Sequence, residues 1–136
     1  MNKPDIKIMA VSNVFSRVMH FKKAGDIEQG HLHTYDHATL VSSGSVRVDI
    51  LSNALTTESS REFIAPAMVF VSKDKFHRLT ALEDNTVCAC IHALRTVDEE
   101  IVDPEFLIDE VVGGSNEVKN LVAEKCGQPM KSFVLG

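Results

Sequence analysis

Four of the six histidines in this chain lie in two short segments, and their spacing is typical of a metal site. Three follow the pattern His31-x-His33-x3-His37, and His77 lies about forty residues downstream. Side chains alternate between the faces of a β-strand, so His31 and His33 are expected to point to the same side. A strand pair and a turn can bring His37 and His77 to the same point. Neutral imidazole binds zinc, iron, nickel and copper, so these side chains predict a site for one divalent metal ion.

Glycines flank the first three histidines at fixed distances. The whole string reads G25-x5-H31-x-H33-x3-H37-x6-G44. It is similar to the first signature of the cupin superfamily, G-x5-H-x-H-x3,4-E-x6-G, with His37 at the position where the family usually has glutamate. The resemblance implies a double-sheet jelly-roll barrel, in which inward-facing side chains near one mouth converge on a ligand.

The second cupin signature, G-x5-P-x-G-x2-H-x3-N, matches this chain only at its histidine, when that position is aligned with His77. The other four fixed positions hold proline, serine, aspartate and alanine in this sequence. The polar segment 72–75 still suits an exposed turn that leads into the strand of His77. The resemblance therefore covers about residues 25 to 95, and its first half carries most of it.

The replacement of the family's glutamate by His37 changes the charge of the predicted site. A divalent ion held by three imidazoles and one carboxylate keeps a local charge of about +1, whereas four neutral imidazoles leave it at about +2. The higher charge favours an anionic or chelating ligand. Imidazole donors favour iron, nickel, copper, cobalt or zinc over manganese and magnesium. Two coordination schemes are open. Either all four histidines bind the ion, or three bind it and the fourth contacts those ligands without binding the ion.

Other polar residues near the first signature are weaker candidates. Tyr35, the only tyrosine, is the candidate catalytic residue because its hydroxyl can reach a substrate or a proton; the alternative is a residue on the barrel rim. Asp36 either faces away from the metal or orients an imidazole. His92 shares its parity along the chain with the two cysteines before it, so it either lines the interior or is an ordinary core or edge histidine. His20 has no partner that the sequence identifies.

Composition limits the class of protein. The 136 residues have a mass of 15.0 kDa, which predicts one domain over residues 1–136. A net charge of −5, with no basic run longer than Lys22-Lys23, argues against nucleic acid as a partner. The N-terminus lacks the apolar stretch of a signal peptide, and no segment approaches about 18 uninterrupted apolar residues. We therefore expect a cytoplasmic protein with no membrane partner.

The cysteines agree with a reducing compartment. Cys88 and Cys90 lie in an apolar run, so we expect buried free thiols that pack as small hydrophobes. A C-x-C metal pair is the alternative, although no second pair follows at the spacing of a zinc ribbon. Cys126 lies near the end of the chain, and no disulfide is predicted.

Short strand-like runs separated by turn residues predict an all-β sandwich or small barrel, and the cupin resemblance selects a jelly roll over about residues 10 to 98. The polar run 52–60 is expected to be a turn, and the apolar run Met68–Val71 a strand buried on both faces. The phenylalanines are assigned first to the core, namely Phe15, Phe21, Phe63, Phe70 and Phe76. The expected strands are 14–21, 29–33, 37–42, 46–50, 61–64, 68–71, 76–81 and 86–95.

The C-terminal segment, residues 103–136, predicts two short helices. The first helix is expected to start at Asp103, which is followed by a proline and a glutamate, and to end at Gly113-Gly114. The second starts at Ser115 and ends at Gly127. These helices are expected to cover the barrel or a second subunit. The apolar end 133–135 and the open sheet edges of a jelly roll predict a homodimer, and cupins are frequently dimers.

The function classes that remain all use a small molecule. The first is a metal-dependent oxidoreductase, dioxygenase-like, with iron or another redox metal and an enolisable dicarbonyl, thiol or aromatic diol as substrate. The second is a metal-dependent isomerase or lyase, for which the sequence places no general base. The third is a non-catalytic module that binds a small ligand. Whether the protein is an enzyme stays open at this point.

Overall fold

The computed structural model of the chain describes most of the first hundred residues and two short pieces beyond them. Its contacts form two compact units, Met1–Ile6 with Val18–Cys90 and Lys7–Arg17 with Ile91–Gly136. The first is termed the histidine unit below. A single domain over residues 1–136 stays a prediction. The described residues are 2–11, 13–30, 36–52, 56–73, 75–95, 100–101 and 130–131.

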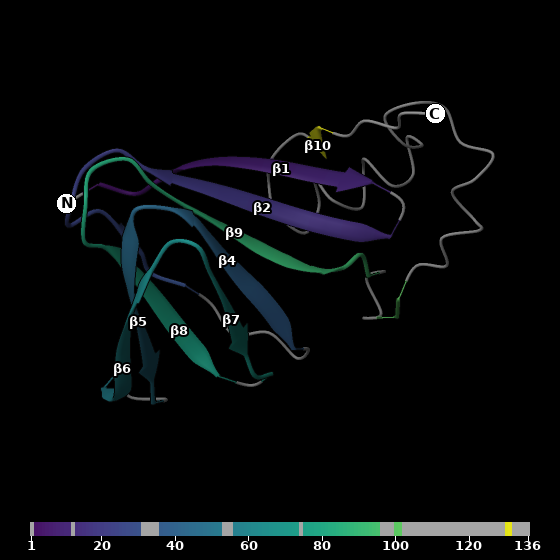
Figure 1. Cartoon of the computed structure of the whole chain (residues 1–136). Helices are drawn as coiled ribbons and strands as arrows, with labels where there is room; N and C mark the ends of the chain where they lie inside the picture. The colour runs from purple at the N-terminus through teal and green to yellow at the C-terminus, as the bar shows by residue number, and fades with distance from the viewer. Residues whose placement is uncertain are drawn as a thin grey trace. The chain divides into compact units, whose positions relative to one another are not determined.

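None of the described residues lies in a helix, and their regular elements are all β-strands (Figure 1). The strands are β1 (Asp5–Val11), β2 (Val14–Phe21), β3 (Ile27–Glu28), β4 (His37–Ser43), β5 (Ser45–Leu51), β6 (Thr57–Ile64), β7 (Ala67–Val71), β8 (Phe76–Ala81), β9 (Thr86–Ala93) and β10 (Met130–Lys131). Within the described residues they form two sheets, ordered β10-β1-β2-β9-β4-β7 and β3-β8-β5-β6. The predicted all-β architecture of two sheets is confirmed.

Six strands lie close to where the sequence places them, because their hydrophobic alternation is clear. β2 and β8 have the predicted bounds, and β4, β5, β7 and β9 differ from them by two residues or fewer at each end. β1 was not predicted, although Ile6, Ile8 and Ala10 alternate with residues that are more exposed. The predicted strand 29–33 is replaced in part by β3, which ends before Gly30.

The prediction of a turn over residues 52–60 is wrong for its second half. Residues 57–60 belong to β6, which pairs with β5 through the register Asp49↔Ser60 and Val48↔Arg61. β6 is an edge strand, and seven of its eight side chains are exposed. An edge strand needs one hydrogen-bonded neighbour and no apolar face, so its sequence carries no hydrophobic alternation to detect.

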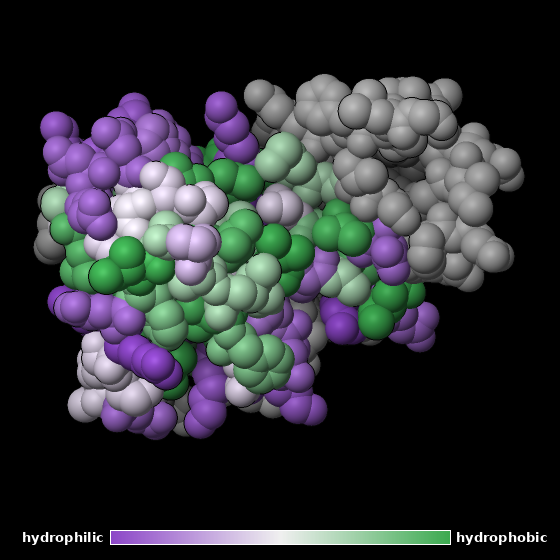
Figure 2. Space-filling view, viewed as in Figure 1, coloured by the Kyte–Doolittle hydropathy of each residue, from purple (hydrophilic) through white to green (hydrophobic). Residues whose placement is uncertain are grey.

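The prediction that Met68–Val71 is buried on both faces is also wrong. Met68 and Phe70 are 62% and 68% exposed, so Phe70 is not a core residue. β7 is the edge strand next to β4, and its alternate side chains, such as Val71, point to the interior. Figure 2 shows hydrophobic side chains on the displayed face over the region where β4 and β7 lie.

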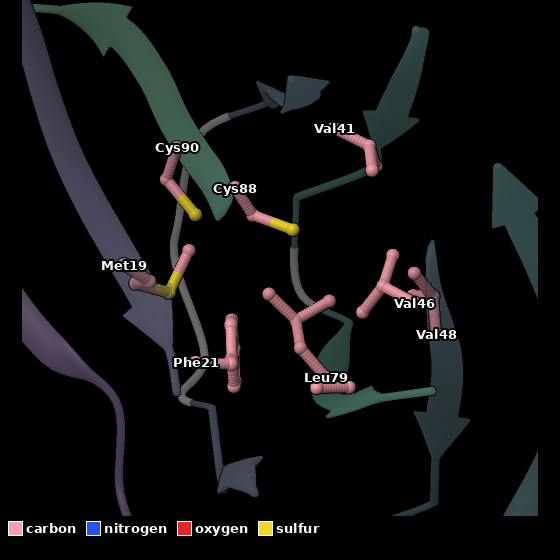
Figure 3. Close-up of a cluster of buried hydrophobic side chains, with 9 residues drawn as sticks. Met19, Phe21, Val41, Val46, Val48, Leu79, Cys88 and Cys90 are labelled. Atoms are coloured by element: carbon pink, nitrogen blue, oxygen red, sulfur yellow. The ribbon is translucent and has the colours of Figure 1, made fainter. Parts of the chain in front are cut away.

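The core of the histidine unit lies between its two sheets. Its buried members are Met19, Phe21, Val41, Val46, Val48, Leu79, Ala81, Cys88 and Cys90. Figure 3 shows the labelled side chains converging from β2, β4, β5, β8 and β9. Both cysteines are free and buried, as predicted. Burial raises the pKa of the Cys88 thiol to about 12, and the neighbouring Cys90 adds to the effect, so Cys88 packs as a neutral hydrophobe.

A buried ionic cluster on the opposite face of the β3-β8-β5-β6 sheet ties three strands together. Asp49 of β5 is 2% exposed and lies 3.1 Å from the Arg78 guanidinium and 3.5 Å from that of Arg47, and it accepts a 2.7 Å hydrogen bond from Ser60. Burial alone raises the pKa of Asp49. The Ser60 hydrogen bond and the two arginines outweigh it, so the net pKa is lowered. The cluster fixes β8, and therefore His77, in register with β5.

The C-terminal predictions fall mostly outside the described residues. Met130–Lys131 form β10, which pairs in parallel with Ile8 and Met9. The two predicted helices, Cys126 and the apolar end 133–135 are not among the described residues. Along the described part of the chain, no helix has the length and hydrophobicity needed to cross a membrane.

Candidate functional site

Two of the four predicted metal ligands lie side by side in the interior of the histidine unit. His37 is the first residue of β4, and His77 is the second residue of β8. These strands belong to different sheets, so only the packing of one sheet on the other brings the two rings together. Their centroids are 4.9 Å apart with an interplanar angle of 45°. Both residues are buried, at 5% and 2% exposure.

This separation fits two imidazoles that bind one ion. A metal–nitrogen bond of about 2.1 Å puts each ring centre about 3.2 Å from the metal, so ligands at 90° to 109° have centroids about 4.5 to 5.2 Å apart. The observed 4.9 Å falls in that interval. The donor set also fits, because neutral imidazoles in a buried site are ordinary ligands for the ions named above.

One nitrogen of the His77 ring contacts a backbone carbonyl. Its Nδ1 lies 3.4 Å from the carbonyl oxygen of Lys75, two residues earlier in the chain. When Nδ1–H donates to a backbone carbonyl, the lone pair of the neutral ring is on Nε2. His77 stands opposite Ile50 on β5, so its ring is on the core side of the sheet.

The chain that leads to His31 runs directly against His77. β3 pairs with β8 through Ile27↔Thr80 and Glu28↔Leu79. Gly30 follows with a φ of +80°, and a Cβ at this position would lie 1.4 Å from the carbonyl oxygen of His77. Only glycine allows this approach and this φ together. Sequence reasoning missed Gly30, although it directly precedes His31.

The other end of the same segment is anchored at His37. Asp36 is exposed, and its Oδ1 accepts a 2.6 Å hydrogen bond from the backbone N–H of Lys73. Of the two alternatives for Asp36, this contact favours a carboxylate that faces away from the metal. Residues 31–35 thus connect Gly30, which touches His77, to Asp36, which precedes His37. His31, His33 and Tyr35 themselves lie outside the described residues.

The described residues by themselves do not complete a metal site. Among them, no group of three or more histidine, cysteine, aspartate or glutamate side chains could hold an ion. Two of the predicted ligands are brought together, and the other two are in the segment that is not described. The four-histidine site therefore stays a prediction.

Two further polar residues share the interior face of the β3-β8-β5-β6 sheet with His77. Residues directly opposite on antiparallel strands point to the same side. Glu28 is opposite Leu79, and Arg61 is opposite Val48, and both of these partners are core residues. Arg61 and Phe63 are two residues apart, so the sequence already indicates that they share one face of a strand. Only the register with β5 shows that this face is the interior one.

The remaining histidines have local explanations. His92 belongs to the other unit, where it stacks on Phe15 with 4.5 Å between ring centroids and its Nδ1 lies 2.6 Å from the Ala93 carbonyl oxygen. This contact favours the ordinary structural role. His20 has a partner after all, since its Nε2 lies 3.2 Å from Oδ1 of Asn85.

Several solved structures resemble this one. KdgF from a Halomonas species has a TM-score of 0.55 and 19% sequence identity, covering 68% of this chain and 80% of that one. A cupin superfamily protein from Desulfitobacterium hafniense has a TM-score of 0.53 and 11% identity, covering 69% and 82%. An oxalate oxidase bound to the substrate analogue glycolate has a TM-score of 0.53 and 16% identity, covering 66% and 50%. No protein-family model matches the sequence, and no curated protein sequence matches it either.

Proposed function

The chain has the cupin fold, and on this premise we propose that it is a metal-binding cupin protein that acts as a dioxygenase-like oxidoreductase on a small, chelating, anionic organic molecule. The observation that carries the proposal is the buried pair of His37 and His77, whose ring separation suits two ligands of one ion. The second support is Gly30, the residue directly before His31, which lies against the backbone carbonyl of His77.

The proposed ligands are His31, His33, His37 and His77, and the ion is iron, nickel, copper, cobalt or zinc. When bound, such an ion polarises a chelating ligand and, if it is redox-active, exchanges electrons with it. A shell without a carboxylate keeps a charge of about +2 on the ion, which favours an enolate or a thiolate as the substrate. The similar structure of an oxalate oxidase shows that this fold can carry an oxidase, which supports the proposal of an oxidoreductase.

We propose a distinct role for each of the other features of the site. The Lys75 carbonyl holds the His77 ring in one orientation. Burial of both described histidines keeps water away from the ligand nitrogens. Tyr35 is the proposed catalytic residue, because it lies one residue before Asp36 and two before His37 in the chain. Its hydroxyl is proposed to hold or move a proton of the substrate.

A metal-dependent isomerase or lyase is the second candidate, and one observation favours it. Glu28 of β3 is half-buried and lies opposite Leu79 of β8, which is two residues from His77 on the same face of that strand. A carboxylate in that place is suited to remove a proton next to a carbonyl group. The third candidate, a non-catalytic module that binds a small ligand, needs no catalytic residue.

The test starts with metal analysis of protein purified without a histidine tag. Iron-, nickel- and copper-loaded protein is then assayed for oxygen consumption with diketones, thiols and catechols. Oxygen uptake that depends on the metal and falls in Tyr35→Phe supports the proposal. Proton exchange or isomerisation without oxygen uptake, lost in Glu28→Gln, establishes the second candidate. If a ligand raises the melting temperature and no reaction is detected, the non-catalytic binding module is the function that remains. Absence of any metal refutes all metal-dependent readings.

We also propose that the protein forms a homodimer. Three large apolar side chains are exposed at the adjoining edge of β6 and β7, namely Ile64 at 75%, Met68 at 62% and Phe70 at 68%. An edge strand with exposed apolar side chains is stabilised by pairing with a second copy. Light scattering should give a molecular mass of about twice 15.0 kDa for the wild type and about 15.0 kDa for Phe70→Lys. A monomeric wild type at micromolar concentration would contradict this proposal.

The predictions on partners and location stay predictions. We propose that the protein is cytoplasmic and has no membrane partner. We also propose that it does not bind nucleic acid, because its net charge is −5 and its longest basic run has two residues.

A further inference from the structure

The edge strands of the two sheets differ in length and in charge. β10 and β7 are the edges of one sheet, and β3 and β6 are the edges of the other. β10 and β3 have two residues each, and β6 carries Glu58, Arg61 and Glu62. Short edges and charged edges both hinder the pairing of a sheet with another chain. β7 has five residues and no charged residue, so among the described strands it is the edge that lacks this protection.

Within the described part of the chain, β7 has a strand partner on one side only. That partner is β4, with Met68 opposite Leu40 and Phe70 opposite Ala38. The backbone groups on the other side of β7 can therefore pair with a further strand. Met68 and Phe70 project to the same face, at 62% and 68% exposure, and Figure 2 shows hydrophobic side chains over this region. The edge thus offers a further strand both hydrogen bonds and apolar contacts.

The residue pattern of β7 is complementary to itself. Its central residue is Val69, and two β7 strands can pair antiparallel about a twofold axis at that residue. In this register Met68 of one copy is opposite the partner's Phe70, and the symmetry repeats the contact on the other side of the axis. A thioether beside an aromatic ring is a favourable contact, and apolar pairs across two strands stabilise a sheet. A second copy of the chain therefore fits this edge.

Charge and area also favour a second copy as the partner. The chain has a net charge of −5, so two copies repel each other, and contact between them is least costly where the surface is uncharged. Side chains of this size have about 200 Å² of surface, so the exposed parts of Met68 and Phe70 amount to about 500 Å² over two copies. That is half of the roughly 1,000 Å² that a specific interface needs, and the paired backbones of the two strands add to it.

We propose that two copies of the chain join by antiparallel pairing of their β7 strands, centred on Val69. The sheet then continues from β4 and β7 of one copy to β7 and β4 of the other. This inference rests on the homodimer proposed above and specifies its contact. Val71, the last residue of β7, is opposite His37 at the start of β4. Pairing at this edge therefore also stabilises the strand that holds His37 in place.

A disulfide at the twofold axis tests both the strand and the register. Opposite residues of an antiparallel pair have Cβ atoms about 4.5 to 5.5 Å apart, so Val69→Cys brings two thiols within reach of each other and keeps Met68 and Phe70. Ser59→Cys is the matched control, because Ser59 is an exposed residue of β6, the edge strand of the other sheet. The wild type gives the background from its own three cysteines. Each protein is oxidised mildly and analysed by non-reducing electrophoresis.

Light scattering gives a second, independent measurement. Met68→Lys places a charge against the partner's Phe70, so it should lower the molecular mass from about twice 15.0 kDa to about 15.0 kDa. Val14→Lys is the control, because Val14 is an exposed apolar residue of β2, which is an inner strand of its sheet, and this variant should stay dimeric. Circular dichroism shows whether each variant is folded.

We expect covalent dimer as the main product of Val69→Cys and only the wild-type background in Ser59→Cys. The inference is overturned if the wild type is dimeric and Val69→Cys forms no more covalent dimer than Ser59→Cys, or if folded Met68→Lys stays dimeric. In those cases the homodimer stands and its contact lies elsewhere. If Met68→Lys does not fold, the disulfide experiment decides alone. A monomeric wild type at micromolar concentration refutes the homodimer itself, and light scattering shows this before any variant is made.

Discussion

Substitution of Gly30 by alanine tests whether the backbone contact with His77 positions the histidine segment. The new Cβ would lie 1.4 Å from the His77 carbonyl oxygen, and ordinary contact begins at 3.4 Å, so one of the two strands must move by about 2 Å (3.4 − 1.4). A shift of that size breaks the pairing of β3 with β8 at the point where the chain enters His31.

The expected cost has two parts. An alanine at a φ of +80° costs about 1 to 2 kcal/mol, because its Cβ approaches the carbonyl oxygen that follows it. The overlap with His77 adds about 1 to 3 kcal/mol, as for other overpacked sites. We therefore expect the free energy of unfolding of Gly30→Ala to fall by about 2 to 5 kcal/mol, and metal affinity to fall with it.

Gly25→Ala is the matched control for this variant. Gly25 has a φ of +92°, and nothing lies within 4 Å of the position of its added Cβ. It should therefore lose only the first part, about 1 to 2 kcal/mol, and keep its metal. Urea unfolding gives both free energies, and elemental analysis gives the metal content. Equal losses of stability in the two variants, or full metal content in Gly30→Ala, would refute the proposed role of the contact.

Three further predictions concern single side chains. His37→Ala and His77→Ala should each abolish stoichiometric metal binding, whereas His92→Ala should keep it; elemental analysis that finds the metal retained in both of the first two rules out the site. Because the folded-state pKa of Asp49 is lowered, its ionised form stabilises the fold above about pH 4, and this contribution is lost as the pH falls through the folded-state pKa; urea unfolding of Asp49→Asn at pH 7 and pH 3 should show a smaller loss on acidification than the wild type, and an equal loss contradicts the assignment. With its pKa raised to about 12, the Cys88 thiol should resist iodoacetamide at pH 8 in the folded protein and react once urea unfolds it, as mass spectrometry of the labelled peptide would show; rapid labelling of folded protein speaks against its burial.

Local patterns in the sequence determined much of this protein. Alternating apolar residues predict β2, β4, β5 and β8, because a strand buried on one face must repeat with a period of two. The spacing of glycines and histidines predicted the cupin fold, and it selected His37 and His77 before their contact was visible. Burial of Cys88 and Cys90 followed from their apolar neighbours.

The position of each strand in its sheet was decided only by the tertiary structure. Met68 and Phe70 are as hydrophobic as core residues, yet they are exposed because β7 is an edge strand with its outer face uncovered by the described residues. The polar half of β6 is also a strand at a sheet edge, and it forms because pairing with β5 supplies its hydrogen bonds. Alternation shows which residues share a face, but it does not show what lies against that face.

The candidate site depends on pairing between residues far apart in the chain. The contact of Gly30 with His77 and the interior position of Arg61 both follow from the register of β8 and β6 against their neighbours. A shift of one residue in either register would turn these side chains to the opposite face. Such registers are set by the packing of the whole core and by the buried Asp49 cluster. The sequence therefore selected the two histidines that meet in the interior, and the tertiary structure decided which glycine lies against them.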